Sequence, residues 1–289
     1  MHSTERSHFS HEAHRPTPTG FRGHLSRGLH LTRTSLRVLL KDSNLLAIPL
    51  LALVVIGFVW LLVTLSLVLL GFPPASPSSS FLYQELFVAY LITYFLSTYF
   101  MAAILGAAHA RLDGRKPTLA EGLQAANASV FRLLGWSLVA STVGVCARLA
   151  SLRWEGASRV VARVFGASWP IASVFVLPAV VMEGLGPVKA FRRSRTLLKE
   201  IWSADECGVL GTGVTFALLF LVGLVPFLWG ALGDGGGLAV FASVLYWLLL
   251  TVLWSVVHAI LVTALYHYAT ASEASFGFQW QALNHPWVR

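Results

Sequence analysis

The sequence predicts an all-α membrane protein: a polytopic bundle of six transmembrane helices, with amphipathic helices in the cytoplasmic interface. Charged residues make up only 12% of the 289 residues, and apolar residues make up 56%. A soluble domain carries about 25% charged residues, so this chain could not cover a soluble surface. The apolar residues form long uninterrupted runs instead of alternating with polar ones, which favours helices over strands in a bilayer.

Six runs are candidates for spanning helices, because a helix crosses the hydrocarbon core with about 20 apolar residues. The third run is short, but Arg132 and Arg148 flank it and their long side chains can reach opposite membrane surfaces. We expect a single membrane domain over 21–289, preceded by a disordered, His-rich cytoplasmic tail over 1–20. The predicted spans lie near 45–70, 86–108, 133–149, 164–182, 208–232 and 238–268.

The placement of basic residues predicts the orientation, since cytoplasmic loops carry an excess of Lys and Arg. With both termini in the cytoplasm, all but four of the 21 Lys and Arg residues fall on the cytoplasmic side. The four exceptions are Arg148, Arg153, Arg159 and Arg163. We therefore expect a multi-pass protein of the plasma membrane with both termini inside.

Three cytoplasmic segments, near 25–41, 118–131 and 188–202, carry apolar side chains on one helical face. In the last segment, a rotation of about 100° per residue separates the basic residues from Phe191, Leu197 and Leu198. Thr118 and Glu121 have the spacing of a capping box at a helix start. We expect these segments to lie along the membrane with basic side chains facing anionic headgroups. The candidate surface residues are Arg33, Arg37, Lys189, Arg192, Arg193 and Lys199.

Three ionisable residues in or beside the spans are candidate functional residues: Glu183, His258 and Arg148. Glu183 ends the fourth predicted span, where an ion pair with Arg192 or Arg193, or a cap on the next helix, is the structural interpretation. The functional interpretation is a gating or headgroup-binding carboxylate. His258 lies well inside the last span, where a neutral packing role competes with a functional one. The pattern predicts no catalytic residue, no cofactor and no metal site.

The chain resembles a family of prokaryotic six-helix membrane proteins of unknown function. The most specific stretches are Phe-Val-Leu-Pro at 175–178 and Glu-Gly-Leu-Gly-Pro at 183–187, followed by Arg193-Ser194 and Trp202. Asp113-Gly114 with Pro117-Thr118, and Ala-Leu-Tyr-His-Tyr-Ala at 264–269, add to them. His267 departs from the pattern, since a basic residue is expected there. The resemblance implies a prokaryotic inner-membrane protein and supplies no catalytic residues.

Three functional hypotheses follow. The first is a non-enzymatic membrane protein whose basic cytoplasmic face binds anionic lipid or a partner, either as a homo-oligomer or with other membrane proteins, and without nucleic acid. The second is a transporter or lipid-handling permease with a polar cavity between the helices. The third, an intramembrane enzyme, lacks any visible pairing of nucleophile and base at membrane depth.

Overall fold

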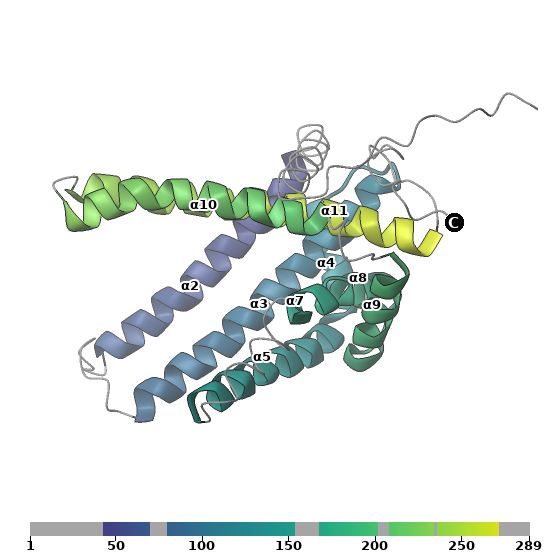
Figure 1. Cartoon of the computed structure of the whole chain (residues 1–289), viewed down its shortest axis with the longest axis horizontal. Helices are drawn as coiled ribbons and strands as arrows, with labels where there is room; N and C mark the ends of the chain where they lie inside the picture. The colour runs from purple at the N-terminus through teal and green to yellow at the C-terminus, as the bar shows by residue number, and fades with distance from the viewer. Residues whose placement is uncertain (1–42, 70–79, 154–167, 202–207, 234–235, 272–289) are drawn as a thin grey trace, which may run out of the picture.

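The computed structural model describes residues 43–69, 80–153, 168–201, 208–233 and 236–271. All regular structure in these ranges is helical, with no strand, as the sequence predicts (Figure 1). The tail over 1–20, Arg33 and Arg37 lie outside the described residues. The elements are η1 (Ser43–Leu46), α2 (Ala47–Leu69), α3 (Ser80–Leu112), α4 (Leu119–Ala128), α5 (Val130–Arg153), α7 (Ser168–Ser173), α8 (Val176–Met182), α9 (Pro187–Ile201), α10 (Gly208–Leu232) and α11 (Gly236–Ala271).

Four helices are long and apolar enough to cross a membrane, and they coincide with the first, second, fifth and sixth predicted spans. Their apolar stretches are Ala47–Leu69, Glu85–Leu112, Thr212–Leu232 and Gly236–His267. A fifth candidate is the pair α4 and α5, which passes the same test together but bends by 69° at Ser129. Ser129 donates a hydrogen bond to the Val180 carbonyl at 3.4 Å, which attaches the bend to α8.

The fourth predicted span is not one continuous helix, which corrects the sequence-based prediction for 164–182. Its described part forms α7 and α8, of six and seven residues, separated at Val174 and Phe175. Pro170 and Pro178 each occupy the third position of their helix. The backbone N–H of that position has no partner within a helix, so a proline there costs no hydrogen bond. Each proline thus belongs to the beginning of a short helix and does not kink a long one. The uniform apolar composition of the segment concealed this break.

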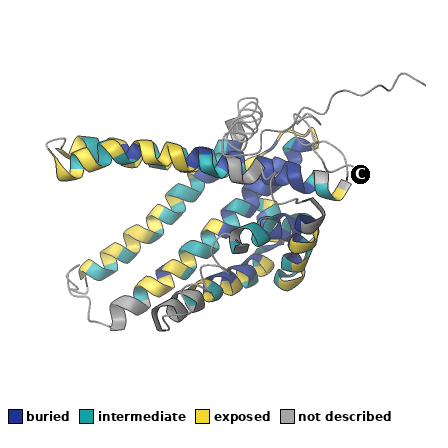
Figure 2. Cartoon of the chain, viewed as in Figure 1, coloured by how far each residue is buried: buried dark blue, intermediate teal, exposed yellow. Residues whose placement is uncertain are grey.

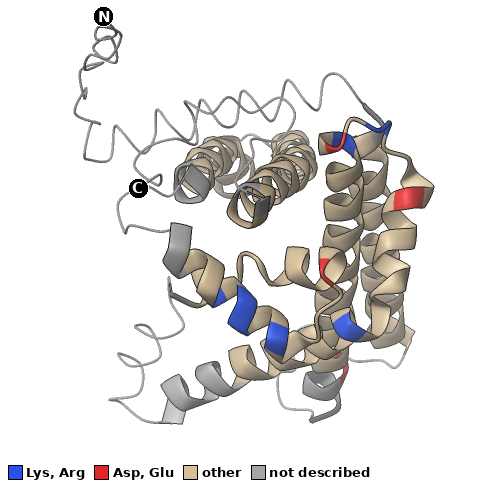
Figure 3. Cartoon of the chain, turned by 90° about the vertical axis from the view of Figure 1, so that its right-hand side faces the viewer, with Lys and Arg blue, Asp and Glu red and all other residues tan. Residues whose placement is uncertain are grey.

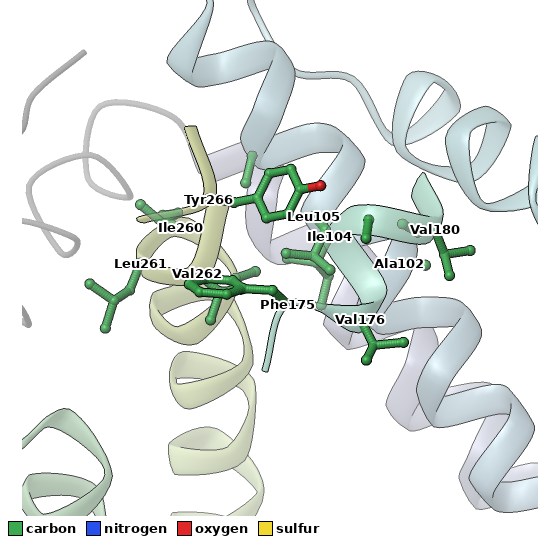
Figure 4. Close-up of a cluster of buried hydrophobic side chains, with 14 of the residues drawn as sticks. Ala102, Ile104, Leu105, Phe175, Val176, Val180, Ile260, Leu261, Val262 and Tyr266 are labelled. Atoms are coloured by element: carbon green, nitrogen blue, oxygen red, sulfur yellow. The ribbon is translucent and has the colours of Figure 1, made fainter. Parts of the chain in front are cut away.

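The buried core gathers at one end of the bundle, which we call the basal end. It is where η1, the start of α2, the ends of α3 and α11, and α4, α8 and α9 meet (Figures 1 and 2). Figure 4 shows its centre, with side chains from α3, α8 and α11 in contact around Phe175 and Tyr266, whose rings lie 5.8 Å apart. Away from this end, α10 and α11 stay paired but diverge from α2 and α3 (Figure 1), and Val54, Val225 and Leu238 are largely exposed.

Glycines set the closest helix contacts at the basal end. A Cβ atom on Gly122 of α4 would lie 2.8 Å from the Ala103 carbonyl oxygen and 2.6 Å from the end of Ile48. A Cβ on Gly106 of α3 would lie 2.5 Å from the Ala125 methyl group. Small residues that allow close backbone approach are a general means of packing helices in membranes. The predicted capping box of Thr118 and Glu121 begins α4, so this helix is fixed at its start and along its face.

Ser194 of α9 satisfies the polar groups that the break between α7 and α8 leaves free. Its hydroxyl donates to the Ala172 carbonyl at 2.7 Å and accepts from the Phe175 N–H at 3.2 Å. The residue is fully buried. Water therefore cannot replace either hydrogen bond, and α9 depends on this serine for its attachment to the break.

We expect Ser194→Ala to lower the free energy of unfolding by about 1–3 kcal/mol, the cost of leaving buried backbone groups without partners. Thr196→Ala is the matched control, since Thr196 lies two residues away, is exposed, and bonds only its own helix at the Arg192 carbonyl. Unfolding of the two purified variants by denaturant in mixed micelles measures the difference. Equal stabilities of the two variants would contradict the assigned role of Ser194.

Candidate functional site

The basal end carries the charged side chains of the protein. Every Lys and Arg whose side chain the structure describes belongs to this end, as does each described acid except Glu85 (Figure 3). Glu85 lies in the outer half of α3, where Ser66 of α2 donates a hydrogen bond to it. The basic residues are Arg111, Arg115, Lys116, Arg132, Lys189, Arg192, Arg193 and Arg195.

Glu183 organises a polar cluster between α8, α9 and α11. One of its carboxylate oxygens accepts a hydrogen bond from Arg193 Nε at 3.1 Å and another from the Tyr266 hydroxyl. Partial burial alone would lower the pKa of Arg193, but the hydrogen bond and the charge of Glu183 outweigh it and raise this pKa above its ordinary value. The ion pair expected from the sequence is therefore confirmed with Arg193, and the contact with Tyr266 is an addition.

The turn after Glu183 sets the direction of α9. Gly184 has a φ of +65°, a conformation that glycine adopts without the steric cost of a side chain. Leu185 closes the turn with a backbone hydrogen bond to the Ala179 carbonyl at 3.3 Å. A Cβ on Gly184 would lie 3.5 Å from the guanidinium of Arg132, which places that exposed cation beside the start of α9.

Helix α9 divides into a packed side and a charged side. Ala190, Ser194 and Leu197 are buried against the neighbouring helices, and Phe191 joins Trp136 of α5 and Trp169 of α7 in a cluster of rings. The opposite side exposes Lys189, Arg192 and Arg195, which we call the basic face of α9. Because the packed side is already covered by protein, the basic face is held in place.

The predicted surface residues have different outcomes. Lys189 and Arg192 lie on the basic face, while Arg193 is turned toward Glu183. The side chain of Lys199, on α9, lies outside the described part of the chain, as does that of Arg148, the candidate functional residue on α5. Arg195 completes the basic face and was missed by the sequence reasoning, although its helical position, about 60° from Arg192, was available as a signal.

His258 lies within α11 as predicted, in a packed environment. Its ring stacks on Trp254 with a centroid distance of 5.0 Å. Its Nδ1 atom is buried and has no hydrogen-bond partner among the described residues. The surroundings are those of a packing residue, and no described acid or hydroxyl lies in hydrogen-bonding contact with it.

A hollow that Trp254, the ring partner of His258, helps to line is apolar. It has a volume of about 540 Å³ and lies between α10 and α11, where Phe216, Phe220, Leu250 and Trp254 line it and Thr251 is the polar contributor. Ser137, Ser141, Thr212 and Thr215, which could line the polar cavity of a permease, are not among the residues that line this hollow. Ser141 bonds the backbone of its own helix at the Ser137 carbonyl, and Thr212 is buried. This hollow is therefore not the polar cavity that a permease would need.

A second polar cluster joins the ends of α3 and α11 and was not predicted. His109 Nδ1 and His267 Nε2 lie 2.6 Å apart with their rings stacked. His109 Nε2 lies 3.6 Å from an Asp113 carboxylate oxygen, which is also 3.5 Å from Arg115. The two histidines are 158 positions apart, so only the fold brings them together. These are the described residues that could hold a metal ion.

The fold and the basal clusters first define a class: an all-helical protein with four or five helices able to span a membrane. More particularly, the chain belongs to the family of unknown function DUF6159, whose sequence pattern matches residues 80–276. The match covers α3 to α11 and both polar clusters, and leaves out α2. It confirms the resemblance to a family of unknown function. No curated protein and no solved structure matches the chain.

Proposed function

We propose that the protein is a non-enzymatic integral membrane protein that binds anionic lipid headgroups through the basic face of α9. The observation that supports this most is that Lys189, Arg192 and Arg195 are exposed together on a helix whose other side is packed against the protein. Juxtamembrane basic residues are attracted to anionic lipid surfaces by about 1 kcal/mol each. Arg132, beside Gly184, extends this positive surface.

The topology proposed with this function has six crossings and both termini in the cytoplasm of a prokaryote. The gathering of Lys and Arg at the basal end supports placing that end inside, because cytoplasmic segments carry the excess of basic residues. Helices α7 and α8, which lie within the predicted span 164–182, would make the fourth crossing as a broken segment. Irregular backbone is tolerated at membrane depth where other parts of the protein satisfy its polar groups. At this break, Ser194 makes those hydrogen bonds.

Lipid preference can be measured directly on the purified protein. Native mass spectrometry of the protein in detergent, titrated separately with phosphatidylglycerol and phosphatidylcholine, gives the affinity for each headgroup. We expect the wild-type chain to prefer phosphatidylglycerol. The triple variant Lys189→Gln, Arg192→Gln and Arg195→Gln should lose on the order of 100-fold of that preference, since three attractions of about 1 kcal/mol each are removed.

The double variant Arg115→Gln and Lys116→Gln is the matched control, because it removes basic residues from the same end of the bundle but from the loop between α3 and α4. It should keep most of the preference. A triple variant that behaves as the wild type would exclude the basic face as the lipid site. Equal loss in both variants would show a diffuse charge effect and contradict a site on α9.

A further inference from the structure

We propose that His109, Asp113 and His267 form a binding site for a divalent transition-metal cation of the Zn²⁺ type. Each residue offers one ligand atom, and these atoms all lie within 4.8 Å of one another. The inference is independent of lipid binding by α9, since it uses other residues on other helices.

The donor set suits such a cation. Two neutral imidazole nitrogens and one carboxylate oxygen are ligands for Zn²⁺, and three protein ligands leave a coordination position for water. Hard cations such as Mg²⁺ and Ca²⁺ prefer oxygen ligands only. A site of two histidines and one carboxylate therefore selects borderline transition metals.

The geometry needs only small side-chain movements to bind an ion. Bonds of about 2.0–2.2 Å to a tetrahedral Zn²⁺ separate neighbouring ligand atoms by roughly 3.3–3.6 Å. In the observed cluster, His109 Nδ1 and His267 Nε2 lie 2.6 Å apart, and one ligand atom from each of the three residues lies within 4.8 Å of the others. His109 offers a single nitrogen to the ion, so its other nitrogen, Nε2, which lies 3.6 Å from Asp113, would not bind the same ion. At 2.6 Å the two ring nitrogens share one proton, since at least one of them must donate. A cation would replace this proton and move the rings slightly apart.

The surroundings favour both access and orientation. The side chains of His109 and Asp113 are 34% and 39% exposed, so an ion can enter from the aqueous side. Arg115 lies 3.5 Å from the same Asp113 oxygen and holds that carboxylate near the histidines. Charged neighbours that orient a ligand are a regular part of metal sites. A bound ion would tie the last turn of α3 to the last turn of α11, the two helices at the centre of the core.

The test must separate this site from the other histidines of the chain. A full-length parent chain that keeps His109, His258 and His267 serves this purpose, purified with a tag that contains no histidine. In this parent, asparagine replaces the remaining seven: His2, His8, His11, His14, His24, His30 and His285. Isothermal titration of the parent in detergent with Zn²⁺ should give one equivalent bound. His109→Ala and His267→Ala in this parent should each weaken binding by at least about tenfold.

Asp113→Asn provides a second variant whose folding is not at risk, because its side chain lies at the surface. It should weaken Zn²⁺ binding and reduce the rise in Tm that Zn²⁺ gives the parent, since a ligand stabilises the folded state in proportion to its affinity. Glu121→Gln is the control, as this carboxylate also contacts Arg115, at 3.8 Å, but is not among the ligands. Absence of Zn²⁺ binding in the parent, or unchanged binding in Asp113→Asn, would overturn the proposal.

Discussion

Gly122→Ala should be among the most destabilising small substitutions in this protein, lowering the free energy of unfolding by about 2–3 kcal/mol. The added methyl group would lie 2.8 Å from the Ala103 carbonyl oxygen, which belongs to the backbone of α3 and cannot rotate away. Helices α3 and α4 would have to separate. The higher helix propensity of alanine offsets at most about 1 kcal/mol of this cost. Denaturant unfolding of the purified protein in mixed micelles measures the change.

Gly57→Ala is the matched control for this prediction. Gly57 lies within α2, and an added Cβ there meets no atom within 4 Å. The same chemical change should therefore leave stability unchanged or raise it slightly. Equal stabilities of the Gly122→Ala and Gly57→Ala variants would contradict the close contact between α3 and α4 at Gly122.

Glu183→Ala should lower the free energy of unfolding by about 2 kcal/mol, because it leaves the Tyr266 hydroxyl and the Arg193 guanidinium without their shared acceptor. Tyr266 is only 3% exposed, so water replaces the lost bond poorly. Arg193 is more accessible, and its share of the loss is correspondingly small. Glu183→Gln keeps an oxygen acceptor in place and should cost less than Glu183→Ala.

A double-mutant cycle with Tyr266→Phe separates the two partners of Glu183. Removing both the acceptor and the hydroxyl leaves no unsatisfied hydroxyl at position 266, so Glu183→Ala should cost less in the Tyr266→Phe background than in the wild type. The unfolding free energies of the four chains give the coupling. If Glu183→Ala costs the same in both backgrounds, the hydrogen bond between Glu183 and Tyr266 contributes nothing to stability.

Much of this architecture can be predicted from local sequence patterns. The long apolar runs predict α2, α3, α10 and α11, and the spacing of Thr118 and Glu121 predicts the start of α4. These signals depend on residues within a few turns of one another. The ion pair of Glu183 with Arg193 belongs to the same category, since only ten positions separate them.

The features that the sequence did not reveal depend on contacts between distant segments. The break between α7 and α8 is stable because Ser194 satisfies it, and this serine lies 22 positions beyond Ala172. The pair of His109 and His267 requires α3 and α11 to lie side by side. Hydropathy reports the length of an apolar segment but not where its backbone hydrogen bonds are made. For this reason the sequence predicts one continuous span where the structure has the two short helices α7 and α8.

Because α10 and α11 diverge from α2 and α3 with distance from the basal end (Figure 1), the outer portions of these long helices should tolerate apolar substitutions better than their basal portions. Val54, Leu61, Val225 and Leu238 are more than half exposed on the outer portions of α2, α10 and α11. In a bilayer, exchanging one of them for another apolar residue replaces one lipid contact with another and leaves the transfer free energy nearly the same. A similar exchange at Leu105 or Val180 creates a void or a clash. Tolerance to mutation should therefore rise along each long helix with distance from the basal end.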